Sequence, residues 1–248
     1  MSPKPTLEQR LAATRRPNNR SVIMRQQWHS LLYLHWAVDP ALLTSRLPAG
    51  LSIDTFDGRA YLGIVPFYMH GLRPRFGPPA PGISYFPELN LRTYVYDTKG
   101  RPGVWFFSLD ADSRLSVCIA RRAFSLNYHY ARMRYRRSNS GHVRLTCQRP
   151  NQAEQRYAYR ARQSIGPAQP GSLAFFLTER YYLFAQTKHG DLRIGQIYHT
   201  PHHLFDTDIS TYSKALFKLN GFTEPKDDYT HAILSPQVDV SIYSLQKI

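Results

Sequence analysis

The feature that most constrains this chain is a series of strand-like runs joined by tight-turn sequences. FPELNLRTYVY and GVWFFSL are rich in β-branched and aromatic residues, and the turn pair Lys99-Gly100 lies between them. An earlier pair of runs, LSIDTF and RAYLGIVPFYM, is joined by Asp57-Gly58, which suits the positive φ angles of a type I′ turn. We therefore predict a hairpin at each of these places.

The second half of the chain continues this pattern with few helices. YARMRYR, HVRLTCQ and YAYRAR predict a three-stranded meander, and VDVSIY predicts a closing strand. Because strands outnumber helices and hairpins dominate, we expect an α+β fold with a mostly antiparallel sheet, as a barrel or as two packed sheets. The helices are expected near Thr6–Arg16, after Asp39-Pro40, between Asp110 and Arg122, near Ser172–Tyr182 and near Thr211–Asn220, with Thr6 and Gln9 capping the first and Asp110 capping the third.

Length and composition favour one domain. With 248 residues, of which 42% are hydrophobic, the chain can bury a large core. We expect an N-terminal appendage over residues 1–21 and a single domain over residues 22–248. No window approaches the ~20 apolar residues of a membrane span, and the first residues lack the apolar region of a secretory signal. A cytoplasmic protein without a membrane partner is expected.

The net charge of +15 is concentrated in two segments, and the larger is 121–162 with eleven arginines against Glu154. In a strand, Arg132, Arg134 and Arg136 share one face because side chains alternate. This basic face is a solvated surface or, alternatively, a binding surface for nucleic acid or another polyanion. The chain has no recognition helix, zinc module or RNP-like aromatic pattern, so the solvated surface is favoured.

A second alternating row is chemically richer. In FPELNLRTYVY, Glu88, Asn90, Arg92 and Tyr94 fall on one face of the predicted strand. In an open sheet this row would be the face toward water. In a barrel it would line a cavity, where a carboxylate, an amide, a guanidinium and a phenol can orient one small polar ligand. The alternation alone leaves both arrangements open.

No motif indicates a metal or a nucleotide. HTPHH supplies three histidines, His199, His202 and His203, but Pro201 interrupts any regular i, i+4 spacing and no HExxH helix is present. P-loop, GxGxxG and GxSxG sequences are missing. We expect no metal and no cofactor.

Five blocks of sequence, in order along the chain, carry a resemblance to a known family. The blocks are LHWAVDPALLTSRLPAGLSIDTFDGRAYLGIVPF, FPELNLRTYV, GVWFFSLDADSRL, LTERYYLF and HAILSPQVDV. They resemble the signature blocks of the YqjF-like bacterial family, which is similar in fold to acetoacetate decarboxylase. The resemblance implies a strand-rich α+β barrel that encloses a pocket, in agreement with the predicted hairpins.

The same resemblance bears on the reaction. Acetoacetate decarboxylase forms a Schiff base through one lysine of an adjacent pair, whose positive neighbour lowers the pKa of the nucleophile. In this chain the matching positions are Tyr128 and His129, or His129 and Tyr130 in a register slipped by one. Neither register supplies an amine, so Schiff-base decarboxylation is not expected. Glu88 matches the acidic position of the family's pocket.

We therefore predict a protein that binds a small organic molecule, a carboxylic acid among the candidates. Glu88 and His129 are the catalytic candidates, as an acid/base pair, and the ligand-binding candidates are Asn90, Arg92, Tyr94 and Tyr128. Two structural alternatives remain open: His129 as a hydrogen-bonded core residue, and Glu88–Arg92 as an ion pair within one strand. Nucleic-acid binding through the basic face is the alternative function, and a homo-oligomer is left open.

Overall fold

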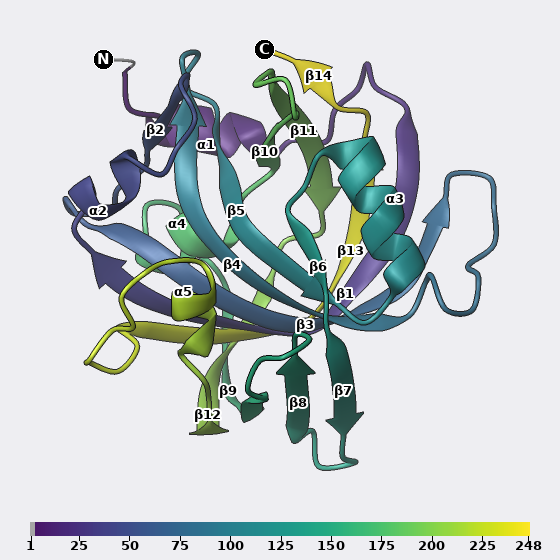
Figure 1. The fold of residues 1–248 in the computed structure, drawn as a ribbon. Helices are drawn as coiled ribbons and strands as arrows, with labels where there is room; N and C mark the ends of the chain where they lie inside the picture. Colours follow the sequence, from purple (N-terminus) through teal and green to yellow (C-terminus); the bar gives the residue numbers. More distant parts are fainter. Residues whose placement is uncertain (1–2) are drawn as a thin grey trace.

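Long, twisted strands make the framework of the molecule, and short helices lie around it (Figure 1). The computed structural model describes residues 3–248. The strands are β1 (Val22–Val38), β2 (Leu51–Ile53), β3 (Ala60–Pro74), β4 (Phe86–Asp97), β5 (Pro102–Ala111), β6 (Tyr128–Tyr130), β7 (Arg132–Arg137), β8 (Val143–Gln148), β9 (Gln155–Pro167), β10 (Tyr182–Gln186), β11 (Leu192–His199), β12 (His203–Thr211), β13 (His231–Tyr243) and β14 (Gln246–Lys247). The helices are α1 (Leu7–Ala13), α2 (Ala41–Thr44), α3 (Arg114–Phe124), α4 (Leu173–Thr178) and α5 (Ala215–Leu219).

The sheet curls back on itself. Its strands follow the order β14-β11-β10-β5-β4-β3-β1-β13-β12-β9-β8-β7, and β11 also pairs with β13 through Ile197–His199. This extra pairing connects β11, β10, β5, β4, β3, β1 and β13 in a ring, while β12, β9, β8 and β7 extend away from it. Most pairings are antiparallel, and the parallel ones join β5 to β6 and to β10. The mostly antiparallel α+β fold predicted from the sequence is confirmed.

The turn predictions are confirmed, but one of the predicted pairings is wrong. Asp57 and Gly58 have positive φ angles of 47° and 77°, and Phe56 and Arg59 form a bridge across them. However, β2 pairs with β4 and not with β3, because the two runs diverge after this bridge. The β4–β5 hairpin and the β7-β8-β9 meander form as predicted.

Of the two predicted helix N-caps, the cap of α1 is correct and the cap of α3 is wrong. Thr6 and Gln9 form the predicted reciprocal capping box of α1. The N-cap of α3 is Ser113 and not Asp110. Asp110 is instead the second-last residue of β5, where it is fully buried and forms an ion pair with Arg149 at 2.6 Å. Over residues 3–248 no helix is long and apolar enough to cross a membrane.

Strand β4 is buried on both faces, and this position decides what its polar row can do. On one face, Leu89 and Leu91 pack in the largest core cluster together with Met133 and Leu145 of the meander and Phe217 of α5. The other face turns toward the inside of the strand ring. Polar side chains on that second face are therefore shielded from bulk water by the sheet itself.

Candidate functional site

The inner face of β4 borders a cavity of about 390 Å³. Glu88, Asn90 and Arg92 line it and are 2%, 5% and 8% exposed. Of the two arrangements that the sequence left open, the structure has the cavity. Tyr94, the fourth member of the predicted row, is fully buried outside the lining and donates a hydrogen bond to the Leu177 carbonyl oxygen at 2.9 Å.

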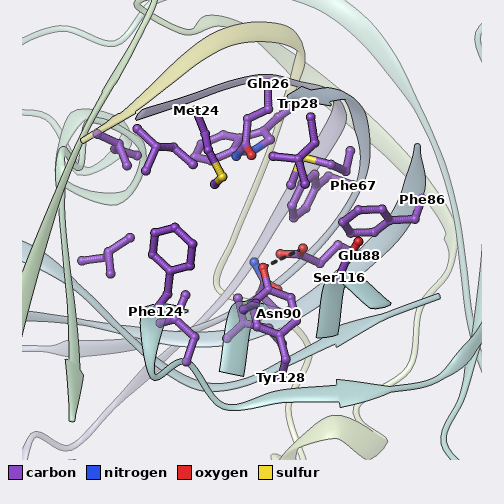
Figure 2. A pocket seen from close by; sticks show the side chains of 18 of the residues that line it. Met24, Gln26, Trp28, Phe67, Phe86, Glu88, Asn90, Ser116, Phe124 and Tyr128 are labelled. Atoms are coloured by element: carbon purple, nitrogen blue, oxygen red, sulfur yellow. Dashed lines mark hydrogen bonds between the residues drawn. The ribbon is translucent and has the colours of Figure 1, made fainter. Parts of the chain in front are cut away.

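The rest of the cavity wall is mainly apolar. In Figure 2, Glu88, Asn90 and Tyr128 gather on one side, while Met24, Gln26 and Trp28 lie on the opposite side. A volume of this size lies in the lower part of the usual range of small-molecule sites, ~300–1,000 Å³. The cavity could therefore enclose a small molecule with a large apolar part. Its apolar lining includes Trp28, Leu31, Phe67, Phe86, Phe106, Phe124 and Ile197.

Glu88 is a buried carboxyl group, and within residues 3–248 it forms no ion pair. The Tyr128 hydroxyl donates to Glu88 Oε2 at 3.0 Å, and the Asn90 amide is a second hydrogen-bond partner. Burial raises the pKa of Glu88 to about 8, although both hydrogen bonds act to lower it. At neutral pH the group is therefore mostly protonated, and it can donate or accept a proton close to neutrality.

The structure does not bring together the two partners that the sequence suggested for Glu88. His129 follows Tyr128 on β6, so its side chain turns to the other face, where Asp110 and Arg149 are its charged neighbours. Burial lowers the pKa of His129, which is half-buried and lies outside the cavity lining. Tyr128 occupies the place beside Glu88. The alternative ion pair between Glu88 and Arg92 does not form either, because the carboxyl group bonds to Tyr128 and Asn90.

Arg92 is a buried cation with neutral partners. Its Nη2 donates to the Tyr94 hydroxyl at 3.1 Å and to the Leu177 carbonyl oxygen at 3.0 Å. The guanidinium lies 5.1 Å from the Tyr33 ring centroid, and its Nε has no hydrogen-bond partner among the described residues. Within residues 3–248, none of the ion pairs includes Arg92. The positive charge is therefore not neutralised by a contacting carboxylate.

A second arginine of the cavity wall, Arg180, has an acid partner. Its Nη1 lies 2.7 Å from Asp54 Oδ2, and Arg10 of α1 binds the same carboxylate at 2.7 Å. Although burial opposes it, the charges of Arg180 and Arg10 lower the pKa of Asp54. The buried Asp54 carboxylate thus forms ion pairs with both arginines, and it links the N-terminal helix α1 to the cavity wall. Local sequence patterns do not predict this cluster, because Arg10 and Arg180 are 44 and 126 residues away from Asp54.

Two histidines of the HTPHH segment, His199 and His202, lie near Arg92. His199 lines the cavity, and His202 bonds to the hydroxyl groups of Tyr33 at 3.2 Å and Ser235 at 2.9 Å. Burial lowers the pKa of His202 well below its ordinary value, so the ring is neutral. From the spacing of its histidines, this segment could be considered only as a possible metal site. The position of His202 depends instead on its hydrogen bonds to Tyr33 of β1 and Ser235 of β13, which are distant in sequence, so no local pattern predicts it.

No lysine is available for a Schiff base inside the cavity. Among residues 3–248, the residues that line it include two buried arginines, Arg92 and Arg180, and Arg73 nearer the surface, but no lysine. The wall offers a carboxyl group, phenol, amides and guanidinium groups. These groups can bind an oxyanion and transfer protons, and they cannot form an iminium.

The fold is similar to that of acetoacetate decarboxylase-like proteins of known structure. An acetoacetate decarboxylase-like enzyme from Sphingomonas wittichii RW1 is 14% identical, with a TM-score of 0.63 over 92% of this chain and 94% of that one. The enduracididine biosynthesis enzyme MppR complexed with pyruvate is 12% identical, with a TM-score of 0.65 over 92% and 91%. Acetoacetate decarboxylase from Legionella pneumophila is 11% identical, with a TM-score of 0.62 over 94% and 90%. At these identities the likeness shows the fold alone.

Sequence comparison gives a closer relationship. The chain is 40% identical over 208 residues to "Uncharacterized protein YqjF" of Bacillus subtilis (strain 168), which covers 83% of this chain and 85% of that protein. Residues 25–239 match the model of DUF2071, described as an uncharacterized conserved protein. That match spans the meander and all of the strand ring except the first residues of β1 and the last residues of β13. Of the residues that line the cavity, Met24 and Ile242 lie outside it. The chain therefore belongs to the DUF2071 family, as its resemblance to YqjF-like sequences predicted, and it has an acetoacetate decarboxylase-like fold.

Proposed function

We propose that the cavity binds a small organic acid whose carboxylate contacts Arg92. The observation that carries this proposal is a buried guanidinium whose hydrogen-bond partners are neutral oxygens and whose Nε has no hydrogen-bond partner within residues 3–248. A buried charge without a counter-charge is costly in free energy. A ligand carboxylate would supply the missing anion through charge-assisted hydrogen bonds, for which a guanidinium is well shaped.

The apolar wall supports a ligand with a substantial hydrocarbon part. Trp28, Phe67 and Phe86 can contact such a part without losing hydrogen bonds to water. A small carboxylate, pyruvate, is bound by MppR, which has the same fold. That example supports an acid as the ligand class, although MppR is distant in sequence.

Acid/base chemistry at Glu88 is the reaction that this wall supports, with Tyr128 as the hydrogen-bond partner in place of His129. A carboxyl group with a pKa of about 8 is a stronger base than an ordinary glutamate once it is ionised, and it still donates a proton at neutral pH. Decarboxylation through an iminium is not proposed, because the cavity wall over residues 3–248 contains no lysine.

The proposal is tested by comparing an acid with its amide. We expect the wild-type protein to bind 4-phenylbutyrate about 10- to 100-fold more tightly than 4-phenylbutyramide in calorimetry, the usual range for hydrogen bonds to a charged group. Arg92→Met should remove this preference, because it keeps side-chain length and loses the charge. Arg134→Met, on the exposed face of β7, is the matched control and should retain it. Equal affinity of the acid for wild type and Arg92→Met would overturn the proposal.

Polyanion binding through the basic face is the second candidate. Arg132, Arg134 and Arg136 are exposed on β7, as the alternation predicted. The neighbouring strands weaken this candidate, since Arg156, Arg160 and Arg162 form ion pairs with Glu154, Asp208 and Asp206. Part of the positive charge of this face is thus neutralised within the protein.

A further inference from the structure

The cavity wall carries two groups of polar side chains with different chemistry. We call Arg92, Thr178, Arg180 and His199 the arginine end, and Glu88, Asn90, Tyr128 and Ser116 the glutamate end. We propose that the ligand is an elongated acid that carries its carboxylate at the arginine end and a neutral hydroxyl or carbonyl oxygen at the glutamate end. This inference rests on the function proposed above and specifies the substrate class.

Strand geometry sets the separation of the two ends. Glu88 and Arg92 are four residues apart on β4, which corresponds to about 13 Å between Cα atoms at ~3.3 Å per residue. The Arg92 guanidinium contacts the Tyr94 hydroxyl and the Leu177 carbonyl, so it points further away from Glu88 along the strand. A molecule as short as pyruvate could therefore contact one end only.

The charges around the two ends differ in sign. At the arginine end the Arg92 charge lacks a contacting acid in residues 3–248. At the glutamate end the charged neighbour that affects Glu88 is Asp110 on β5, which is itself paired with Arg149. An anionic group is thus favoured beside Arg92 and disfavoured beside Glu88, which orients the ligand.

The glutamate end offers hydrogen bonds that suit a neutral oxygen. Glu88 is mostly protonated at neutral pH, and a protonated carboxyl group carries an O–H donor. Asn90 Oδ1, an acceptor beside it, has no hydrogen-bond partner in the part of the chain that the structure describes. A hydroxyl group could accept from Glu88 and donate to Asn90, whereas a carbonyl oxygen would use the first of these bonds. Figure 2 shows Glu88, Asn90 and Tyr128 side by side on the same side of the cavity.

The length requirement gives a direct test with two matched series of acids. Calorimetry would measure binding of unbranched alkanoates with four, six, eight and ten carbons, and of the corresponding ω-hydroxy acids. A hydroxyl buried without a partner weakens binding, by about 1–3 kcal/mol or roughly 5- to 150-fold. We expect this penalty for short chains and its disappearance near eight carbons, where the hydroxyl reaches Glu88.

Glu88→Leu identifies the group responsible. In this variant the affinity for octanoate should stay within about threefold of wild type, which also shows that the protein is folded, while 8-hydroxyoctanoate should bind about 10-fold or more weakly than in wild type. Ser140→Leu, on the exposed loop between β7 and β8, is the control and should change neither affinity.

The outcomes separate this inference from the proposed function. If alkanoates bind through Arg92 but the hydroxyl weakens binding at every chain length, the second polar subsite is wrong and the acid site stands. If neither series binds, or if Arg92→Met leaves alkanoate binding unchanged, the acid site itself is wrong. Equal loss of octanoate and 8-hydroxyoctanoate binding in a folded Glu88→Leu protein would also overturn the subsite.

Discussion

Strands β4 and β7 carry similar alternating rows of polar residues and place them in opposite environments. On β4, Glu88, Asn90 and Arg92 face a cavity and are almost fully buried. On β7, the arginines that alternate with Met133 and Tyr135 are exposed. The difference comes from position in the sheet, because β4 lies inside the strand ring and β7 is the last strand of its extension. Alternation therefore identifies the residues that share a face, and the topology decides whether that face meets water.

The comparison extends to three kinds of arginine. Arg180 is buried with Asp54, Arg92 is buried with neutral partners, and Arg134 is exposed on β7. Burial removes water from a guanidinium group, so its partners determine its contribution to stability. The predictions that follow test the buried and the exposed groups of this comparison.

The largest effect is expected at Asp54. Asp54→Asn keeps the shape of the side chain and leaves Arg10 and Arg180 without their anion, so the free energy of unfolding should fall by about 3–5 kcal/mol. Chemical denaturation would measure it. Asp208→Asn is the matched control, because its ion pair with Arg160 is exposed and should contribute ~0–1 kcal/mol. Similar losses in the two variants would contradict the contrast between buried and exposed pairs.

Glu88 should give stability an unusual pH dependence. Its pKa is about 8 in the folded protein, against an ordinary value of 4.5, so between these values the folded state holds a proton that the unfolded state has released. The contribution is fully present below pH 4.5 and falls by about 1.4 kcal/mol per pH unit until pH approaches 8. Glu88→Gln should remove this slope from denaturation curves measured between these pH values.

The control for Glu88→Gln is Glu154→Gln, which changes an acid beside the exposed Arg156. This variant should keep the wild-type slope, because its side chain is in contact with water. If wild type and Glu88→Gln lose stability with pH at the same rate, Glu88 is ionised in the folded protein at neutral pH. The hydrogen-bond donor assigned to the glutamate end would then be wrong as well.

Local sequence patterns predicted much of the framework. The type I′ turn at Asp57-Gly58, the capping box of α1 and the β7-β8-β9 meander depend on neighbouring residues, and all are present. The pairing of β2 with β4 was missed because it joins segments more than 40 residues apart, and hairpin rules consider only adjacent runs. Resemblance to a known family implied a barrel, whereas the pairing of β11 with β13 joins distant segments that no local pattern connects.

The site was predictable to a similar degree. Alternation placed Glu88, Asn90 and Arg92 on one face, and the structure places all three in the cavity wall. Choosing between Tyr128 and His129 needed the parallel pairing of β6 with β5, because a shift of one residue reverses the faces of a strand. Arg180, His199 and Trp28 reach the cavity from distant segments of the chain. Their roles depend on tertiary packing, for which a single sequence carries no local signal.

The exposed arginines of β7 should contribute little to the free energy of unfolding. Replacing Arg132, Arg134 and Arg136 together by alanine should change the free energy of unfolding by no more than ~0.5 kcal/mol per site, because their charges are solvated. In a gel shift with duplex DNA between about 50 and about 200 mM salt, we expect weak binding and similar salt slopes for wild type and the variant. A steep slope for wild type that the variant loses would show phosphate contacts and favour the polyanion candidate.

The smallest expected effect is the lack of a trapped adduct. Borohydride reduces an iminium formed between a lysine and a keto acid to a stable secondary amine, which mass spectrometry detects on the intact chain. The cavity wall of residues 3–248 contains no lysine, and Tyr128, beside Glu88, carries a phenol that cannot form an iminium. With pyruvate and borohydride, the mass of this protein should therefore stay unchanged, while an acetoacetate decarboxylase treated in parallel gains the adduct. A stoichiometric adduct that maps to one of the seven lysines of this chain would require a lysine to enter the cavity, and it would replace the acid/base chemistry proposed at Glu88 by covalent catalysis.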